Sequence, residues 1–66
     1  MTPVSSSNIK SIGYETENLY LEYKNGAIYQ YANVPKTVYD ELLASSSVGS
    51  FVALIIKGKY SYQRIN

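Results

Sequence analysis

The chain has 66 residues and a formal net charge of +1, with eight tyrosines and neither tryptophan, cysteine nor histidine. A chain of this length forms one domain with a thin core, and without cysteine it has no disulfide and no thiolate metal site. The lack of histidine removes the commonest general base and metal ligand, and the near-neutral charge argues against binding of nucleic acid or membranes through bulk charge.

The first seven residues are rich in serine and proline, and we expect them to be extended or flexible. They lack the basic and apolar regions of a signal peptide. No apolar run approaches the roughly 20 residues that a membrane span needs. We therefore expect a single domain over residues 1–66 in the cytoplasm, without membrane contact.

Residues 8–14 predict a first strand, in which Ile9 and Ile12 are apolar. Gly13 within this strand indicates a bulge or a close approach of another part of the chain. Residues 15–18 are polar and predict a turn.

The clearest local signal is the pair Asn25-Gly26 between two alternating runs of tyrosine and aliphatic residues, which is typical of a β-hairpin. A two-residue loop pairs Tyr23 with Ile28 and mixes polar and apolar side chains on one face. A three-residue loop that ends at a left-handed Gly26 pairs Tyr23 with Ala27 and gathers the aromatic side chains on one face. Since a one-residue slip moves every side chain to the other face, we prefer the three-residue loop. Its opposite face carries Tyr20, Glu22, Ile28 and Gln30.

Val34-Pro35 ends the sheet, because proline cannot donate to a ladder and suits the first turn of a helix. From residue 36 to about residue 44, apolar side chains recur at helical spacing and predict a helix.

A second short helix is predicted from about residue 48 or 50 to residue 57, with Gly58 at its end. A buried strand is the alternative for residues 51–56. Residues 60–65 alternate and predict a final strand. Together the elements predict an α+β fold, with a three-stranded N-terminal antiparallel meander, a C-terminal strand and one or two short helices.

The residues offer little for catalysis, and we predict that the protein is not an enzyme. No histidine can activate a serine, and Gly-x-Ser-x-Gly does not occur. Asp40 and Glu41 are neighbours on a predicted helix, and Glu15 and Glu17 lie in a predicted turn, so solvated charges are the expected role of all four. We expect no metal and no cofactor.

The tyrosines have two interpretations, both open at this point. Tyrosine suits strands and fills a small core with its ring, but eight of them in so small a domain also indicate an aromatic recognition surface.

Two segments near the C-terminus are candidates for binding. The first is an apolar run too continuous for one face of a short helix, which predicts a protein-interaction module that self-associates as a dimer; its residues are Phe51, Val52, Leu54, Ile55 and Ile56. The second interleaves cations with tyrosines, so that charges can hold phosphates while rings stack on bases. It predicts RNA, tRNA or nucleotide binding as the alternative function, through Lys57, Lys59, Tyr60, Tyr62 and Arg64. A plain edge strand kept soluble by its charges is the structural interpretation of the same residues.

A combination of residues along nearly the whole chain resembles the KTSC domain, a short bacterial and phage domain also appended to some lysyl-tRNA synthetases. The residues are Ser6-Ser7-Asn8-Ile9, Ile12-Gly13-Tyr14, Leu21, Tyr23, Gly26, Tyr29, Tyr31, Val34-Pro35, Val38, Leu42, Ser47, Gly49, Phe51, Ile56-Lys57, Tyr60 and Arg64.

The resemblance implies association with nucleic acid and adds two surface residues to that alternative, Asn8 and Tyr14. Where the family pattern has aromatic and polar residues after Phe51, this chain has an apolar run, which weakens the RNA interpretation and favours a protein partner. A stand-alone copy also looks like a phage or prophage accessory protein, which would lie in the host cytoplasm. Such a protein can act by binding and inhibiting a host defence factor.

Overall fold

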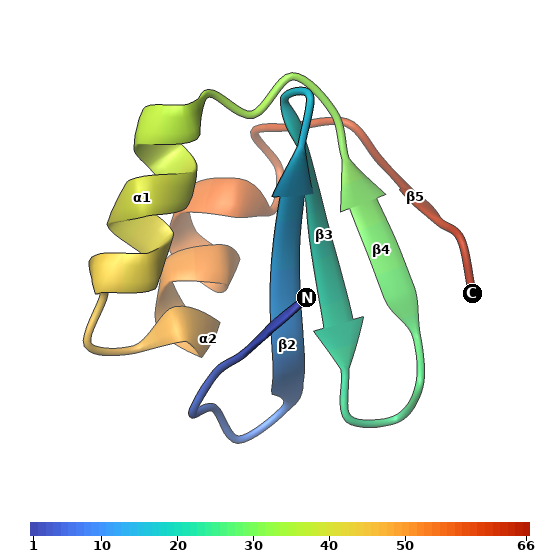
Figure 1. Ribbon diagram of the computed structural model, residues 1–66, viewed down its shortest axis with the longest axis vertical. Coiled ribbons are helices and arrows are strands. Elements are labelled where there is room, and N and C mark those ends of the chain that lie inside the picture. The colour runs from blue at the N-terminus through green and yellow to red at the C-terminus, as the bar shows by residue number, and fades with distance from the viewer.

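An antiparallel sheet of five strands in the order β1-β2-β3-β4-β5 forms the frame of the protein, and the computed structural model describes all residues from 1 to 66 (Figure 1). Each strand pairs with the strand that precedes or follows it in the chain, and residues 32–61, with both helical segments, connect β4 to β5. The predicted α+β class is confirmed, and β1 is a strand that the sequence did not predict. The strands are β1 (Thr2–Pro3), β2 (Ile9–Glu15), β3 (Asn18–Tyr23), β4 (Ile28–Tyr31) and β5 (Tyr62–Arg64).

The hairpin between β3 and β4 has the predicted three-residue register. Leu21 lies opposite Tyr29, and the Tyr23 amide donates to the Ala27 carbonyl at 2.8 Å. Gly26 adopts a φ of +96°, in the left-handed region that favours glycine. Because side chains alternate along a strand, this register sends the leucines of β3 and the tyrosines of β4 to the same face.

Two helical segments pack on that face. Helix α1 runs from Lys36 to Ala44, and α2 (Val48–Phe51) continues directly into a π-helix, η1 (Val52–Ile56). The strand alternative for residues 51–56 is therefore wrong, because an unbroken helical backbone runs through them. Figure 1 shows both helices gathered towards β2, while β4 and β5 lie away from them. No helix has the length and apolar character needed to cross a bilayer.

The N-terminal segment lies along β2 at the edge of the sheet and approaches Gly13 closely. Thr2 pairs with Ile12 in the β1–β2 ladder, and a Cβ at Gly13 would lie 3.1 Å from the Met1 side chain. Gly13 thus permits a close approach, one of its two predicted roles, whereas the bulge of β2 lies between Ile9 and Ser11.

The core lies between the sheet and the helices, and one tyrosine is part of it. Its ten buried residues are Ile9, Ile12, Leu19, Leu21, Tyr31, Val34, Leu42, Val48, Val52 and Ile56. Burial raises the pKa of Tyr31 to about 12, and the hydroxyls of Tyr23, Tyr62 and Tyr29 beside it act in the same direction. The hairpin tyrosines therefore hold the fold together as well as forming its surface.

Gly26→Ala should lower the free energy of unfolding by about 1–2 kcal/mol, because a Cβ is disfavoured in the left-handed region. Gly49→Ala is the matched control, since a Cβ there meets the Ser6 hydroxyl at 3.5 Å, an ordinary contact. Urea unfolding measures both. A Gly26→Ala protein as stable as the wild type would contradict the register.

Alkaline pH should destabilise the fold through Tyr31. The pKa of this side chain is about 12 in the folded state and 10.0 in its ordinary range, so the unfolded state loses its proton first as the pH rises. The contribution of protonated Tyr31 to the stability of the fold is therefore complete below pH 10.0. It falls between pH 10.0 and about 12, and is lost above about 12. Tyr31→Phe cannot ionise, so its urea midpoint should change less over this interval than that of the wild type. Parallel pH profiles for the two proteins would contradict this assignment.

Candidate functional site

Three tyrosines from three adjacent strands form a row on the helix-facing side of the sheet, Tyr23 of β3, Tyr29 of β4 and Tyr62 of β5, which we call the tyrosine row. The rings of Tyr29 and Tyr62 stack at 5.4 Å between centroids with 16° between their planes. Tyr23 meets Tyr29 edge to face at 5.5 Å, and the buried Tyr31 touches Tyr62 at 5.3 Å. The row therefore runs from the hairpin to the last strand of the sheet.

Exposure differs sharply along the row. Tyr23 and Tyr29 are half-buried, whereas Tyr62 is 59% exposed. All tyrosines of the chain other than Tyr62 are half-buried or buried. The sequence could place Tyr62 on a strand face, but only the structure shows that it is the one exposed tyrosine ring.

Two cations lie along the row. Arg64 lies opposite Tyr29 in the β4–β5 ladder, so it shares the face of the row, and its Nε donates to the Asn66 backbone oxygen at 2.8 Å. Lys57 lines a hollow of about 210 Å³ together with Tyr23 and Tyr29. The pKa of Tyr23 is raised, first by burial and then by the neighbouring Tyr29.

The third cation of this region is already in contact with a ring. The ammonium of Lys59 lies 5.7 Å from the centroid of Tyr60, a cation–π distance, and Tyr60 packs against the core. Lys57 and Arg64 are therefore the better placed of the three predicted cations for contact with a ligand.

Carboxylate side chains lie on other parts of the surface. Glu22 accepts a hydrogen bond from the Ser11 hydroxyl at 2.7 Å on the opposite face of the sheet. Asp40 is paired with Lys36 along α1 at 3.1 Å, the single ion pair between side chains. The face of the tyrosine row thus carries positive charge and no acidic side chain among the residues of the row and its hollow. These residues are Tyr23, Asn25, Ala27, Tyr29, Lys57, Tyr62 and Arg64.

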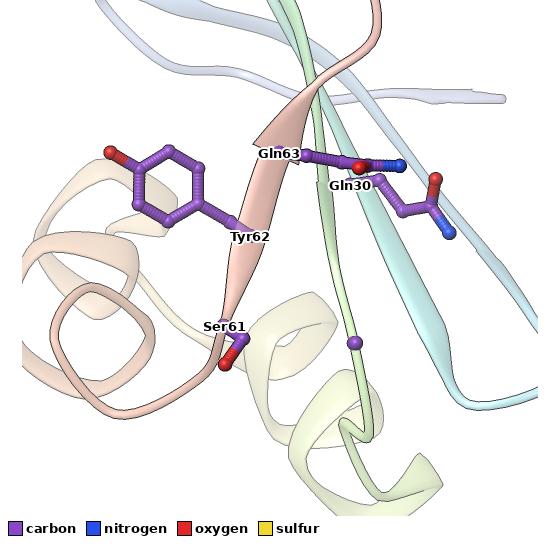
Figure 2. Close-up of a pocket in the computed structure, with 5 residues that line it drawn as sticks. Gln30, Ser61, Tyr62 and Gln63 are labelled. Carbon is purple, nitrogen blue, oxygen red and sulfur yellow. The ribbon is translucent and has the colours of Figure 1, made fainter.

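A second hollow, of about 260 Å³, lies beside β5. Figure 2 shows the side chains of Gln30 and Gln63 pointing together to one side of β5, and the ring of Tyr62 pointing to the other. The two glutamines are direct partners in the β4–β5 ladder. Their amides therefore belong to the face of the sheet opposite the tyrosine row.

The apolar segment 51–56 is only partly available to a partner. Val52 and Ile56 are 2% and 0% exposed, because their four-residue spacing turns both towards the sheet. These two predicted interface residues lie inside the domain, and the prediction is wrong for them. Phe51 is half-buried and packs on the core. Leu54 and Ile55 remain as surface residues, 80% and 39% exposed.

Tyr14 and Asn8, the two candidates added by the family resemblance, lie apart from the tyrosine row. The Tyr14 hydroxyl donates to the Val34 carbonyl at 2.6 Å, and its ring stacks on Tyr39 of α1 at 4.8 Å. Tyr14 therefore ties β2 to the start of α1, a structural role. Asn8 is exposed and lines a hollow near the start of α2.

That hollow gathers residues far apart in the sequence. It has a volume of about 550 Å³ and is lined mostly by serines of two segments, 5–8 and 46–50. Several of the hydroxyls already bond within it, as when the Ser6 hydroxyl donates to Asn8 Oδ1 at 3.3 Å and Ser47 Oγ accepts from the Ser50 amide at 3.4 Å. These hydrogen bonds stay within each segment, and the hollow brings together two serine-rich segments that carry part of the family resemblance.

No group of three or more His, Cys, Asp or Glu side chains is placed to hold a metal ion. The site consists of rings, two cations and backbone groups of an edge strand, which suits contact with a ligand.

Comparisons with known proteins give a consistent family assignment. The KTSC domain family model matches residues 5–60. A protein of Tsukamurella paurometabola is 44% identical over 62 residues, which is 91% of this chain and 92% of that protein. A lysine–tRNA ligase of Trichormus variabilis is 39% identical over 62 residues, again 91% of this chain but 11% of the ligase.

Solved structures agree with the sequence match. The crystal structure of a KTSC domain protein from Yersinia pestis superposes with a TM-score of 0.90 at 37% identity, covering 98% of this chain and 94% of that one. The chain belongs to the KTSC domain family.

Proposed function

We propose that the protein binds single-stranded RNA through the tyrosine row. The observation that carries the proposal is the exposed ring of Tyr62 at the end of a stacked row. Base–aromatic stacking tolerates any base, because every base has a π-face. Lys57 and Arg64 on the same side are suited to phosphate contacts, and Arg64 keeps its remaining guanidinium N–H groups for this purpose.

RNA is the nucleic acid we propose because related segments occur in proteins named lysine–tRNA ligase. The electrostatic contribution to the binding affinity is expected to be small. Two cations on the row support about two phosphate contacts, so the slope of log affinity against log salt concentration should be shallow, roughly −1.4.

Tyr62→Ala should weaken binding of a labelled single-stranded RNA by on the order of tenfold or more, since one stacked base contributes about 1–3 kcal/mol. Tyr62→Phe keeps the ring and should bind as the wild type does. Gln63→Ala is the matched control, because Gln63 lies next in β5 but on the opposite face.

Substitution of the two cations tests their phosphate contacts separately, through the salt dependence of the affinity. Arg64→Gln and Lys57→Gln should each reduce the salt slope by about 0.7, whereas Lys36→Gln, on α1, should leave it unchanged. If RNA shows no retardation by the wild type even at low salt, the proposed function is wrong.

A second candidate function is contact with a protein through Leu54 and Ile55, and the observation in its favour is the exposure of Leu54. The partner would be a second copy of this chain or a host protein, and inhibition of a host defence factor is one form of this function. For a dimer through this surface, Leu54→Lys should give monomers in light scattering at a concentration where the wild type is dimeric. Leu43→Lys, an exposed change on α1, is the control. A wild type that is monomeric at high concentration would contradict self-association.

A further inference from the structure

The tyrosine row is already filled along most of its length. Tyr29 lies between its two neighbours, with Tyr23 at 5.5 Å on one side and Tyr62 at 5.4 Å on the other. Tyr31 supports Tyr62 from the core side at 5.3 Å. The inner rings therefore use their faces and edges on one another, and they offer little area to a ligand.

The row ends at the edge of the sheet. β5 is the last strand, with a neighbour on one side only, and Figure 1 shows it farthest from the helices. Since Tyr29 and Tyr31 occupy the inner side of Tyr62, the open face of this ring looks past β5 into solvent. Tyr62 is the one exposed tyrosine of the row, so a further planar ring can be added to the row at this point.

The two cations, Lys57 and Arg64, lie on the same side of the sheet as this ring. Arg64 follows Tyr62 by two residues on the same face of β5 and lies opposite Tyr29. Lys57 is further along, by the hollow that Tyr23 and Tyr29 line. A base stacked on Tyr62 would thus have its sugar and phosphate running back towards Arg64.

We propose that the site takes one unstacked nucleotide at a time, its base continuing the row on Tyr62 and its phosphate meeting Arg64. Suitable nucleotides are a strand end or a base turned out of a helix or loop, and bases within a duplex are not accessible to the ring. Sheets that bind a run of nucleotides expose two or three aromatic rings for successive bases, whereas this sheet exposes one. The inference rests on the proposed function and makes it more specific.

The dependence of affinity on length tests the inference. Fluorescence-detected binding would be measured with adenosine 5′-monophosphate and with single-stranded oligoadenylates of two, three and six nucleotides. After correction for the number of equivalent positions, affinity beyond the dinucleotide should stay constant within about threefold, because no second ring is free to stack. Each additional stacked base would add on the order of tenfold, so a rise of that size from two to six nucleotides overturns the single-nucleotide inference while leaving RNA binding intact.

A pair of RNA hairpins gives the structural control. A hairpin with one bulged adenosine should bind, and the same hairpin without the bulge, closed by a paired stem and a tightly stacked tetraloop, should bind at least about tenfold more weakly. Tyr62→Ala should abolish the difference, and Gln63→Ala should preserve it. Equal binding of the two hairpins by the wild type overturns the inference. Failure of every probe, the single strands included, overturns the proposed function itself and the inference with it.

Discussion

The register of the β3–β4 hairpin is the constraint on which the rest of the structure depends. Gly26, in the left-handed region, closes a three-residue loop, and the loop sets Leu19 opposite Tyr31 and Leu21 opposite Tyr29. A slip by one residue would send these side chains to the opposite face of the sheet. The helices would then lose part of the apolar surface that they cover, and the tyrosine row would not exist. Core and candidate site thus arise from one local feature of the backbone.

Much of this frame could be predicted from the sequence, because it depends on local signals. The Asn25-Gly26 pair and the alternating runs beside it give the hairpin and its register, and Pro35 gives the start of α1. The turn between β2 and β3 is different. Thr16 and Glu17 both have positive φ, which their residue types disfavour, and the Glu17 carbonyl accepts from the Val34 amide at 2.8 Å. The polar residues 15–18 predicted the turn itself, but a contact from a distant part of the chain holds its backbone conformation, so no local pattern indicates that conformation.

The candidate site could be predicted only in part, because alternation tells which face a residue occupies and not what covers that face. Tyr60 and Tyr62 have the same parity along the chain, yet Tyr60 packs on the core and Tyr62 is exposed. The apolar run at 51–56 suggested one surface, but Val52 and Ile56 complete the core while Leu54 points outward. Tyr29 belongs to the row through its pairing with a strand more than thirty positions away. Such assignments require the packed structure.

The most direct test of the account is an NMR titration of labelled protein with a short single-stranded RNA, following the tyrosine ring signals and the arginine side-chain signals together. The largest shifts are expected at the Tyr62 ring and the Arg64 guanidinium, smaller ones at Tyr29, and none at the stacked pair Tyr14 and Tyr39. Saturable shifts centred on Leu54 and Ile55, or on the serine-lined hollow, with Tyr62 unchanged, would contradict it.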